Sequence, residues 1–218
     1  MGRTLKYDFA GSDFRVTAED LAGSGLAKLF EPDLTPPWRL SVDLGFGRGE
    51  LLLDLARAEP GAAFLGVEYS FKRVLKLARR LARTELRNVR LVCDTAEAIV
   101  GDRLAEGSVH AFWINFPDPW PKKRHHRRRL IQPAFVRQLA GRLEPGGLLH
   151  AATDHEGYAE AIAEVLSAEP LLENVHAPAA WSSQPPLRSA TAYELEWRAL
   201  GRDCRYFAYR RRAIAAVA

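Results

Sequence analysis

Residues 42–50 read Val-Asp-Leu-Gly-Phe-Gly-Arg-Gly-Glu, so a short apolar run ends in three alternating glycines. Residues 39–44 have the composition of a buried β-strand, and residues 51–58 have that of a following helix. Glycine permits positive φ angles and lets a ligand approach the backbone closely. A strand, a glycine turn and a helix in this order predict a ligand site at the carboxyl end of the strand, as in open α/β sheets. An ordinary tight turn is the alternative.

The same alternation continues along the chain and predicts an α/β protein with a doubly wound, mostly parallel sheet. Four more strands and four helices are expected, at 63–67, 89–93, 109–115 and 148–153 and at 72–86, 96–104, 127–143 and 157–166. An aromatic run at 204–209 suits a last, antiparallel strand, and residues 177–190 suit a long loop. Residues 1–37 are expected to form an N-terminal arm with a helix near 18–30, leaving 38–218 as the main domain.

The composition is that of an ordinary globular domain, with 218 residues of which 47% are hydrophobic and 27% charged. No run approaches the roughly 18 apolar residues of a membrane span. The first residues lack the apolar core of a signal peptide, and Cys93 and Cys204 show no CxxC spacing. These features favour a cytoplasmic protein with free thiols. No metal site is expected, because no Cys or His cluster accompanies the adjacent His125 and His126.

The positive charge is concentrated in one segment. Residues 122–129 hold six Lys and Arg and no acid, whereas the whole chain carries a formal net charge of +4, so the remaining residues sum to −2. A solvated charged face is the usual interpretation of such a run. Beside a ligand site it instead indicates an anionic partner, and phosphates bound by these cations would give an affinity that falls steeply with salt.

The glycine spacing indicates what the site binds. A dinucleotide fingerprint requires G-x-G-x-x-G, but here Glu50 stands at the third glycine position. Asp43 would repel a phosphate and attract a cation. S-adenosylmethionine carries a sulfonium and an ammonium and no phosphate, so D-x-G-x-G-x-G favours this cofactor. Glu68 ends the second strand, where an acid can bind ribose hydroxyls. Asp94 ends the third strand, where its carboxylate can accept from an adenine amino group or cap the next helix.

The fourth strand ends in residues 115–122, Asn-Phe-Pro-Asp-Pro-Trp-Pro-Lys. Three prolines in five residues predict a stiff, exposed loop that suits the placement of a planar base. Asp118 lies between two prolines, whose nitrogens cannot donate, and its carboxylate is therefore available to a ligand. The motif differs from the [DN]-P-P-[YFW] of amino-group methyltransferases, which argues against transfer to an exocyclic amine.

From Asp43 to the last strand, the chain resembles the bacterial tRNA (guanine-N7)-methyltransferases. The most specific match is the run from Phe116 to His125 with Arg127-Arg128-Arg129, and residues 152–159, Ala-Thr-Asp-His-Glu-Gly-Tyr-Ala, are also similar to the family. The resemblance implies a seven-stranded class I (Rossmann-like) methyltransferase fold, S-adenosyl-L-methionine as cofactor, and methylation of the variable-loop guanosine 46 of tRNA.

Matching the family's motifs implies roles for individual residues. The cofactor site is expected to contain Asp43, Gly45, Gly47, Glu68, Asp94, Asn115 and Asp118, with Asp118 also catalytic. The substrate-binding residues are expected to be Lys122, Arg124, His125, Arg127, Arg128, Arg129, Asp154, Thr191, Tyr193 and Glu194. The family's late motif is similar to Thr-Lys-Phe-Glu-x-Arg-Gly. Residues 191–197 read Thr-Ala-Tyr-Glu-Leu-Glu-Trp here, so the basic second position and the Arg-Gly pair are replaced.

The expected mechanism is mainly positioning, because guanine N7 carries an in-plane lone pair and no proton. The carboxylate of Asp118 would stabilise the positive charge that develops on the base. To enter the site, the base is expected to leave the stack in which it lies in folded tRNA. Glu194 and Asp154 could accept from guanine N1–H and its amino group. Two other classes remain open: a methyltransferase acting on another RNA or on protein, and a non-catalytic RNA-binding protein. We expect tRNA as partner, no membrane, no obligate protein partner, and a monomer or homodimer.

Overall fold

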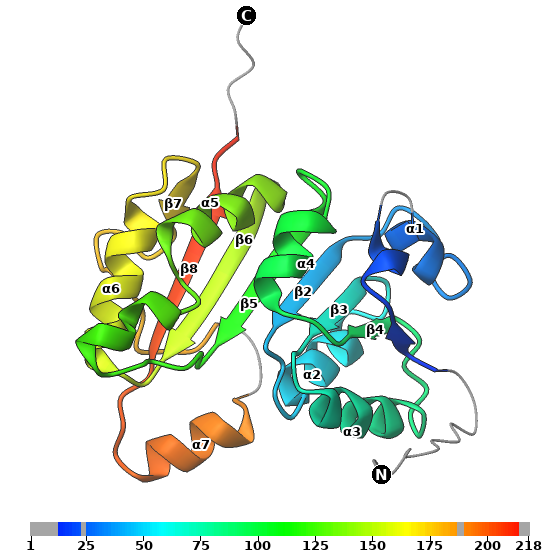
Figure 1. Ribbon diagram of the computed structural model, residues 1–218, viewed down its shortest axis with the longest axis horizontal. Helices are drawn as coiled ribbons and strands as arrows, with labels where there is room; N and C mark the ends of the chain where they lie inside the picture. The colour runs from blue at the N-terminus through cyan, green and yellow to red at the C-terminus, as the bar shows by residue number, and fades with distance from the viewer. Residues whose placement is uncertain (1–12, 23–24, 187–189, 214–218) are drawn as a thin grey trace, which may run out of the picture.

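The computed structural model describes residues 13–22, 25–186 and 190–213. They form one eight-stranded sheet in the order β1-β4-β3-β2-β5-β6-β8-β7, in which β8 pairs antiparallel with β6 and β7 and the other pairs are parallel (Figure 1). The strands are β1 (Arg15–Val16), β2 (Leu40–Leu44), β3 (Ala63–Val67), β4 (Val89–Val92), β5 (Val109–Asn115), β6 (Leu143–Thr153), β7 (Leu172–Asn174) and β8 (Arg205–Arg211). The α/β class and the antiparallel last strands are confirmed.

The helices connect these strands. The helices are η1 (Glu19–Leu21), α1 (Gly25–Phe30), α2 (Glu50–Ala58), α3 (Phe71–Leu81), α4 (Ala96–Asp102), η2 (Lys123–Arg128), α5 (Pro133–Arg142), α6 (Glu156–Ser167) and α7 (Ala192–Ala199), where η denotes a 3-10 helix. In Figure 1, α7 lies beyond the lower edge of the sheet and apart from the helices that cover its faces, where β6 ends and β8 begins. That edge is also the carboxyl end of the parallel strands.

Alternation within the strands divides the core in two. In β3, Leu65 and Val67 pack into the larger cluster with α1, α4, α5 and α6, whereas Phe64 packs into the second cluster with α2 and α3. Likewise Phe112 and Trp113, neighbours in β5, belong to different clusters. Since successive strand residues point to opposite faces, apolar runs of this kind require helices on both sides of the sheet.

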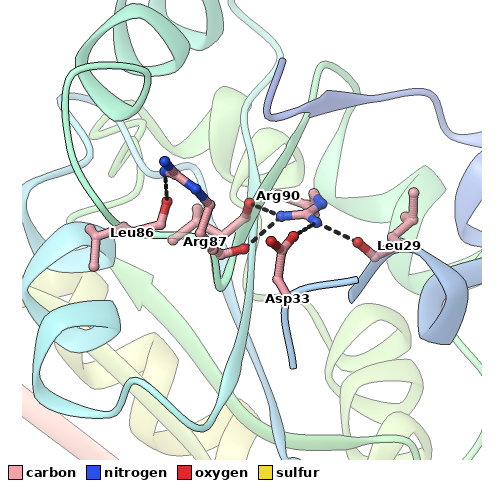
Figure 2. A network of polar contacts seen from close by, with 6 residues as sticks. Leu29, Asp33, Leu86, Arg87 and Arg90 are labelled. Atoms are coloured by element: carbon pink, nitrogen blue, oxygen red, sulfur yellow. Dashed lines mark hydrogen bonds and ion pairs between the residues drawn. The ribbon is translucent and has the colours of Figure 1, made fainter. Parts of the chain in front are cut away.

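The N-terminal segment packs against the sheet through Arg90, as Figure 2 shows. The guanidinium donates to the backbone carbonyl of Leu29 at 2.5 Å and to the carboxylate of Asp33 at 2.6 Å, while its other nitrogen donates to the carbonyls of Arg87 and Val89. It also lies 5.0 Å from the centre of the Phe30 ring. One arginine on β4 thus ties the segment between α1 and β2 to the sheet.

Several elements differ from the sequence predictions. Strand β7 was not expected, and the described residues of the helix expected near 18–30 form the separate helices η1 and α1. Residues 15–16, inside the expected arm, add an eighth strand by pairing with β4, and residues 1–12 of that arm lie outside the described residues. The helix expected at 127–143 is two helices, η2 and α5, because Pro133 starts α5 and the chain is extended at Arg129 and Gln132. Within the tail, residues 192–199 form helix α7, which the sequence reading did not predict.

Candidate functional site

The glycine turn after β2 adopts the backbone that its sequence requires. Gly45, Gly47 and Gly49 have φ angles of 78°, 57° and 73°, which side chains other than glycine rarely tolerate. A Cβ on Gly49, at the start of α2, would also collide with the side chain of Leu77 on α3. The turn therefore brings backbone N–H groups to the carboxyl edge of the sheet without intervening side chains.

Glu68 holds this turn from the neighbouring strand. Its side chain is 2% exposed, and its carboxylate accepts from the backbone N–H of Gly47 at 3.1 Å and of Ser70 at 3.0 Å. Arg73 on α3 lies 3.4 Å from the same carboxylate. Glu68 thus joins the glycine turn to the β3–α3 turn, a structural role that the sequence reading did not assign to it.

Two adjoining cavities open along this edge. One of about 410 Å³ runs past the ends of β3 and β4 and is bordered by Glu68 and Asp94. The other, of about 390 Å³, is bordered by Asp43, Gly47 and Tyr193. Both are lined by the same five residues, namely Gly45, Arg73, Asn115, Phe116 and Asp118. The seven residues expected to bind the cofactor all lie along these two cavities. The helix cap expected as an alternative role for Asp94 falls to Thr95, whose hydroxyl accepts from Ala98 N–H.

Asn115 and Asp118 present unused polar groups to the cavities. The Nδ2 atom of Asn115 is buried and has no hydrogen-bond partner among the residues that the structure describes. A buried amide without an acceptor is costly, so this atom fits a ligand group that would accept from it. Asp118 is exposed and makes no ion pair or hydrogen bond with any residue of the described ranges.

The proline loop that carries Asp118 is strained and braced. Phe116 and Trp120 have φ angles of 51° and 43°, a left-handed conformation that is uncommon for aromatic residues. Arg129 supports the loop: it is 6% exposed, its Nε donates to the carbonyl of Pro119 at 2.8 Å, and its guanidinium lies 4.7 Å from the centre of the Tyr158 ring. The sequence reading assigned Arg129 to RNA, but its guanidinium faces inward and stabilises the loop that positions Asp118.

The other residues of the basic run face outward. Lys122, Arg124 and Arg127 are exposed, on or beside η2. Arg128 borders the larger cavity and lies 5.0 Å from the centre of the Trp120 ring, while His125 contacts the edge of the same ring. The basic run thus starts at the rim of the cavities and continues onto the surface.

Helix α7 brings Thr191 and Tyr193 to the smaller cavity, but not Glu194. Thr191 and Glu194 form a capping box, and Glu194 is 0% exposed. The Tyr206 hydroxyl donates to Glu194 at 2.8 Å and accepts from Arg198 at 2.9 Å. Burial, followed by the Glu194 carboxylate, raises the pKa of the Tyr206 phenol. Glu194 therefore anchors α7 to β8.

Asp154, at the end of β6, is also engaged. Its carboxylate accepts from Arg202 at 2.7 Å, and the Arg202 guanidinium lies 3.7 Å from the centre of the Trp197 ring. Trp197 in turn contacts the ring of Tyr193, which contacts Phe116 in the strained loop. The two acids expected to hold guanine are thus both occupied by protein partners, whereas Phe116 and Tyr193 border the smaller cavity.

The described ranges contain no group of three or more His, Cys, Asp or Glu side chains that could hold a metal ion. Likewise, none of the helices in this part of the chain is long and apolar enough to cross a membrane.

Comparisons with known proteins point to methyltransferases. A family model described as "Putative methyltransferase" matches residues 38–206. The tRNA (guanine-N(7)-)-methyltransferase of Bordetella pertussis is 45% identical over 160 residues, 73% of this chain and 62% of the relative, so this chain spans less than two thirds of that protein. The enzyme of the same name from Alkalilimnicola ehrlichii is 40% identical over 171 residues, 78% of this chain and 72% of the relative.

Solved structures support the fold alone. The 16S rRNA methyltransferase KamB superposes with a TM-score of 0.62 at 16% identity, over 88% of this chain and 94% of that one. The aminoglycoside resistance methyltransferase NpmB1 superposes with a TM-score of 0.56 at 16% identity, over 86% and 92%. The predicted class I methyltransferase fold is therefore confirmed, with β1 as an added edge strand.

Proposed function

Because this chain belongs to the tRNA (guanine-N7)-methyltransferase family, we propose that it transfers the methyl group of S-adenosyl-L-methionine to N7 of the variable-loop guanosine 46 of tRNA. The observation that carries the proposal is the position of Asp118. Its carboxylate has no partner in the described ranges, borders both cavities, and lies a few residues before an exposed basic run. The protein would act in the cytoplasm, with tRNA as its partner and residues 38–218 as its catalytic domain.

The cavity residues fit S-adenosylmethionine. The site is lined by carboxylates and by an amide that has no partner in the described ranges, so it suits an ammonium, a sulfonium and ribose hydroxyls better than a phosphate. Asp43 and the glycine turn would hold the amino-acid end, Glu68 the ribose and Asp94 the adenine, with Asn115 donating to an acceptor of the cofactor. When bound, the cofactor supplies the electrophilic methyl group.

The protein's part in the reaction is to orient the base. Guanine N7 needs no general base, so the rate depends on holding N7 in line with the methyl–sulfur bond. The carboxylate of Asp118 would stabilise the positive charge that the guanine gains. Because Phe116 and Trp120 adopt left-handed conformations and Arg129 braces the loop, the backbone that carries this carboxylate would be held in place before the substrate arrives.

The residues expected to bind the substrate form two groups: those that would touch the RNA and those that would hold these residues in position. We assign direct RNA contacts to Lys122, Arg124, His125, Arg127 and Arg128, and base contacts to Thr191 and Tyr193 at the smaller cavity. Glu194, Asp154 and Arg129 would position these groups, because each is already paired with a protein partner. A change of α7 on RNA binding would be needed to bring Glu194 to guanine.

The test is methyl transfer from labelled S-adenosylmethionine to two unmodified tRNA transcripts, one with guanosine 46 and one with adenosine there. Transfer to the first alone supports reaction, substrate and position together. Transfer to both keeps the methyltransferase and overturns the position. If neither is methylated while the cofactor still binds, the substrate assignment fails, and profiling with other RNAs and with protein pools identifies the alternative.

A further inference from the structure

The positive charge of the chain is not confined to residues 122–129. Residues 71–90 hold eight Lys and Arg and a single acid, Glu85. Most neighbouring cations have two or three other residues between them, so they do not form a continuous basic run. Most of this segment is helix α3, so its charge distribution depends on which face each side chain occupies.

The fold places four of these eight cations on one exposed surface. The apolar residues Val74, Leu75, Leu77, Ala78 and Leu81 are buried against the sheet. Lys72, Lys76, Arg80 and Arg83 are exposed. The first three lie in α3 at the four-residue spacing that aligns side chains along a helix, and Arg83 follows in the turn after α3 ends. From Lys72 to Arg80 this row runs roughly 12 Å at the rise of an α-helix. We call these four cations, with the adjacent Tyr69 and Phe71, the α3 surface.

The row has no counter-charge of its own. None of its four cations forms an ion pair or hydrogen bond with a residue of the described ranges. Lys72 and Lys76, and Lys76 and Arg80, are like charges four residues apart, which destabilise a helix. This exposed face contributes nothing to the core, and its positive charge favours the binding of a polyanion.

Two exposed aromatic rings adjoin the row. Tyr69 is 71% and Phe71 53% exposed, and both stand at the start of α3 beside the larger cavity, which Tyr69 borders. Aromatic faces next to cations are the combination that holds unpaired bases, because every base can stack on a ring while its phosphate meets a cation. An acidic protein surface would use the cations but leave the two rings exposed to water.

The α3 surface and residues 122–129 meet at the same cavity. Tyr69, from the α3 surface, and Arg128, from η2, both line it, and they come from the two sides of β2: Tyr69 follows β3, and η2 follows β5. We propose that the RNA substrate spans the cavity, with its phosphodiester backbone on the basic run at one side and on the α3 surface at the other, and with an unpaired base against Tyr69 or Phe71. This inference rests on the proposed function.

The test compares two variants of the full chain with equal charge change. The α3 variant carries Lys72→Gln, Lys76→Gln, Arg80→Gln and Arg83→Gln, and it spares Arg73, which contacts Glu68. The control carries Lys28→Gln, Arg57→Gln, Arg210→Gln and Arg212→Gln, all exposed and outside the cavities. Affinity for an unmodified tRNA transcript is measured between about 50 and 200 mM salt. S-adenosylmethionine binding by each variant reports that the fold is intact.

We expect the α3 variant to bind tRNA at least about tenfold more weakly, with a salt slope shallower by roughly 0.7 for each cation that contacts a phosphate. The control should stay within about twofold of the wild type. Phe71→Ala should weaken binding with no change of slope, because stacking releases no counterions. Equal tRNA affinity of the α3 variant and the control overturns the inference. The inference is also overturned if the α3 variant keeps its tRNA affinity but no longer binds anionic phospholipid vesicles. That result would assign the α3 surface to a membrane.

The same series separates this inference from the function on which it rests. If the wild type methylates the transcript and the α3 variant binds it normally, the function stands and the α3 surface is not its RNA site. If the wild type neither binds nor methylates the transcript, the proposed function and the inference fail together. At saturating tRNA, the α3 variant should keep its kcat and show the defect in KM, since none of its four changed residues lines either cavity.

Discussion

Replacing Glu68 by glutamine should lower both the stability of the protein and its affinity for the cofactor. The carboxylate accepts two backbone hydrogen bonds, from Gly47 at 3.1 Å and Ser70 at 3.0 Å, and is 2% exposed. The two donors reach different oxygens of the side chain. Glutamine has the same shape but offers one oxygen and one NH₂ group, so it can satisfy one of these backbone donors and must place N–H groups against the other.

The expected loss follows from these two contacts. A hydrogen bond to a charged group contributes about 1.5–3 kcal/mol, and a backbone N–H left without an acceptor adds a desolvation cost of similar size. The Arg73 contact adds little, because that side chain is 55% exposed and screened by water. We therefore expect a decrease of about 2–3 kcal/mol in the free energy of unfolding, or roughly 4–12 °C in Tm for a chain of this length.

The assay is urea unfolding of the two proteins, with calorimetric titration of S-adenosylmethionine. The matched control is Glu97→Gln, the same change at an exposed residue that borders the same cavity and has no partner in the described ranges. The control should unfold within about 0.5 kcal/mol of the wild type. The reasoning is refuted if Glu68→Gln is as stable as the control, or if the glycine turn retains full cofactor affinity without the carboxylate.

Three further results are expected. Asp118→Asn should lower kcat by about a hundredfold or more while tRNA affinity stays nearly constant, because the lost charge acts on the transition state; a matching loss in both would contradict this role. Arg90→Ala should cost about 2–3 kcal/mol in urea unfolding, since it removes the bonds to Leu29 and Asp33 (Figure 2), and Arg90→Lys should recover little. The raised pKa of the Tyr206 phenol predicts stability that is complete below about pH 10 and falls as the unfolded phenol ionises above it. Tyr206→Phe should flatten that alkaline fall in unfolding experiments across pH, and identical slopes would refute the assignment.

The central sheet was predictable because each strand and helix carries a local signal. Apolar runs, glycine turns and helical spacing recur along residues 39–166, and burial on both faces of the sheet explains them. Strand β1 lacked such a signal, because its two residues are held by pairing with β4 rather than by their own composition. Helix α7 did carry one: Thr191 and Glu194 have the spacing of a capping box, which the structure contains.

The candidate site was likewise predictable only where it depends on local sequence. Sequence spacing is sufficient to bring the acids at the strand ends to one edge, because parallel strands end together. Whether an acid is free or paired depends on residues far away in the chain. The Glu194 carboxylate accepts from Tyr206 and that of Asp154 pairs with Arg202, and neither partner is adjacent in sequence. The direction of Arg129 depends likewise on Tyr158.

The altered late motif can be understood from these long-range partners. Where the family pattern has Arg-Gly, this chain has Glu196 and Trp197. The Trp197 ring carries the guanidinium of Arg202, which also pairs with Asp154. Glycine at 197 could not support that stack. Trp197 therefore joins α7 to the end of β6 through Arg202, and its contacts through Tyr193 to Phe116 connect α7 to the proline loop as well.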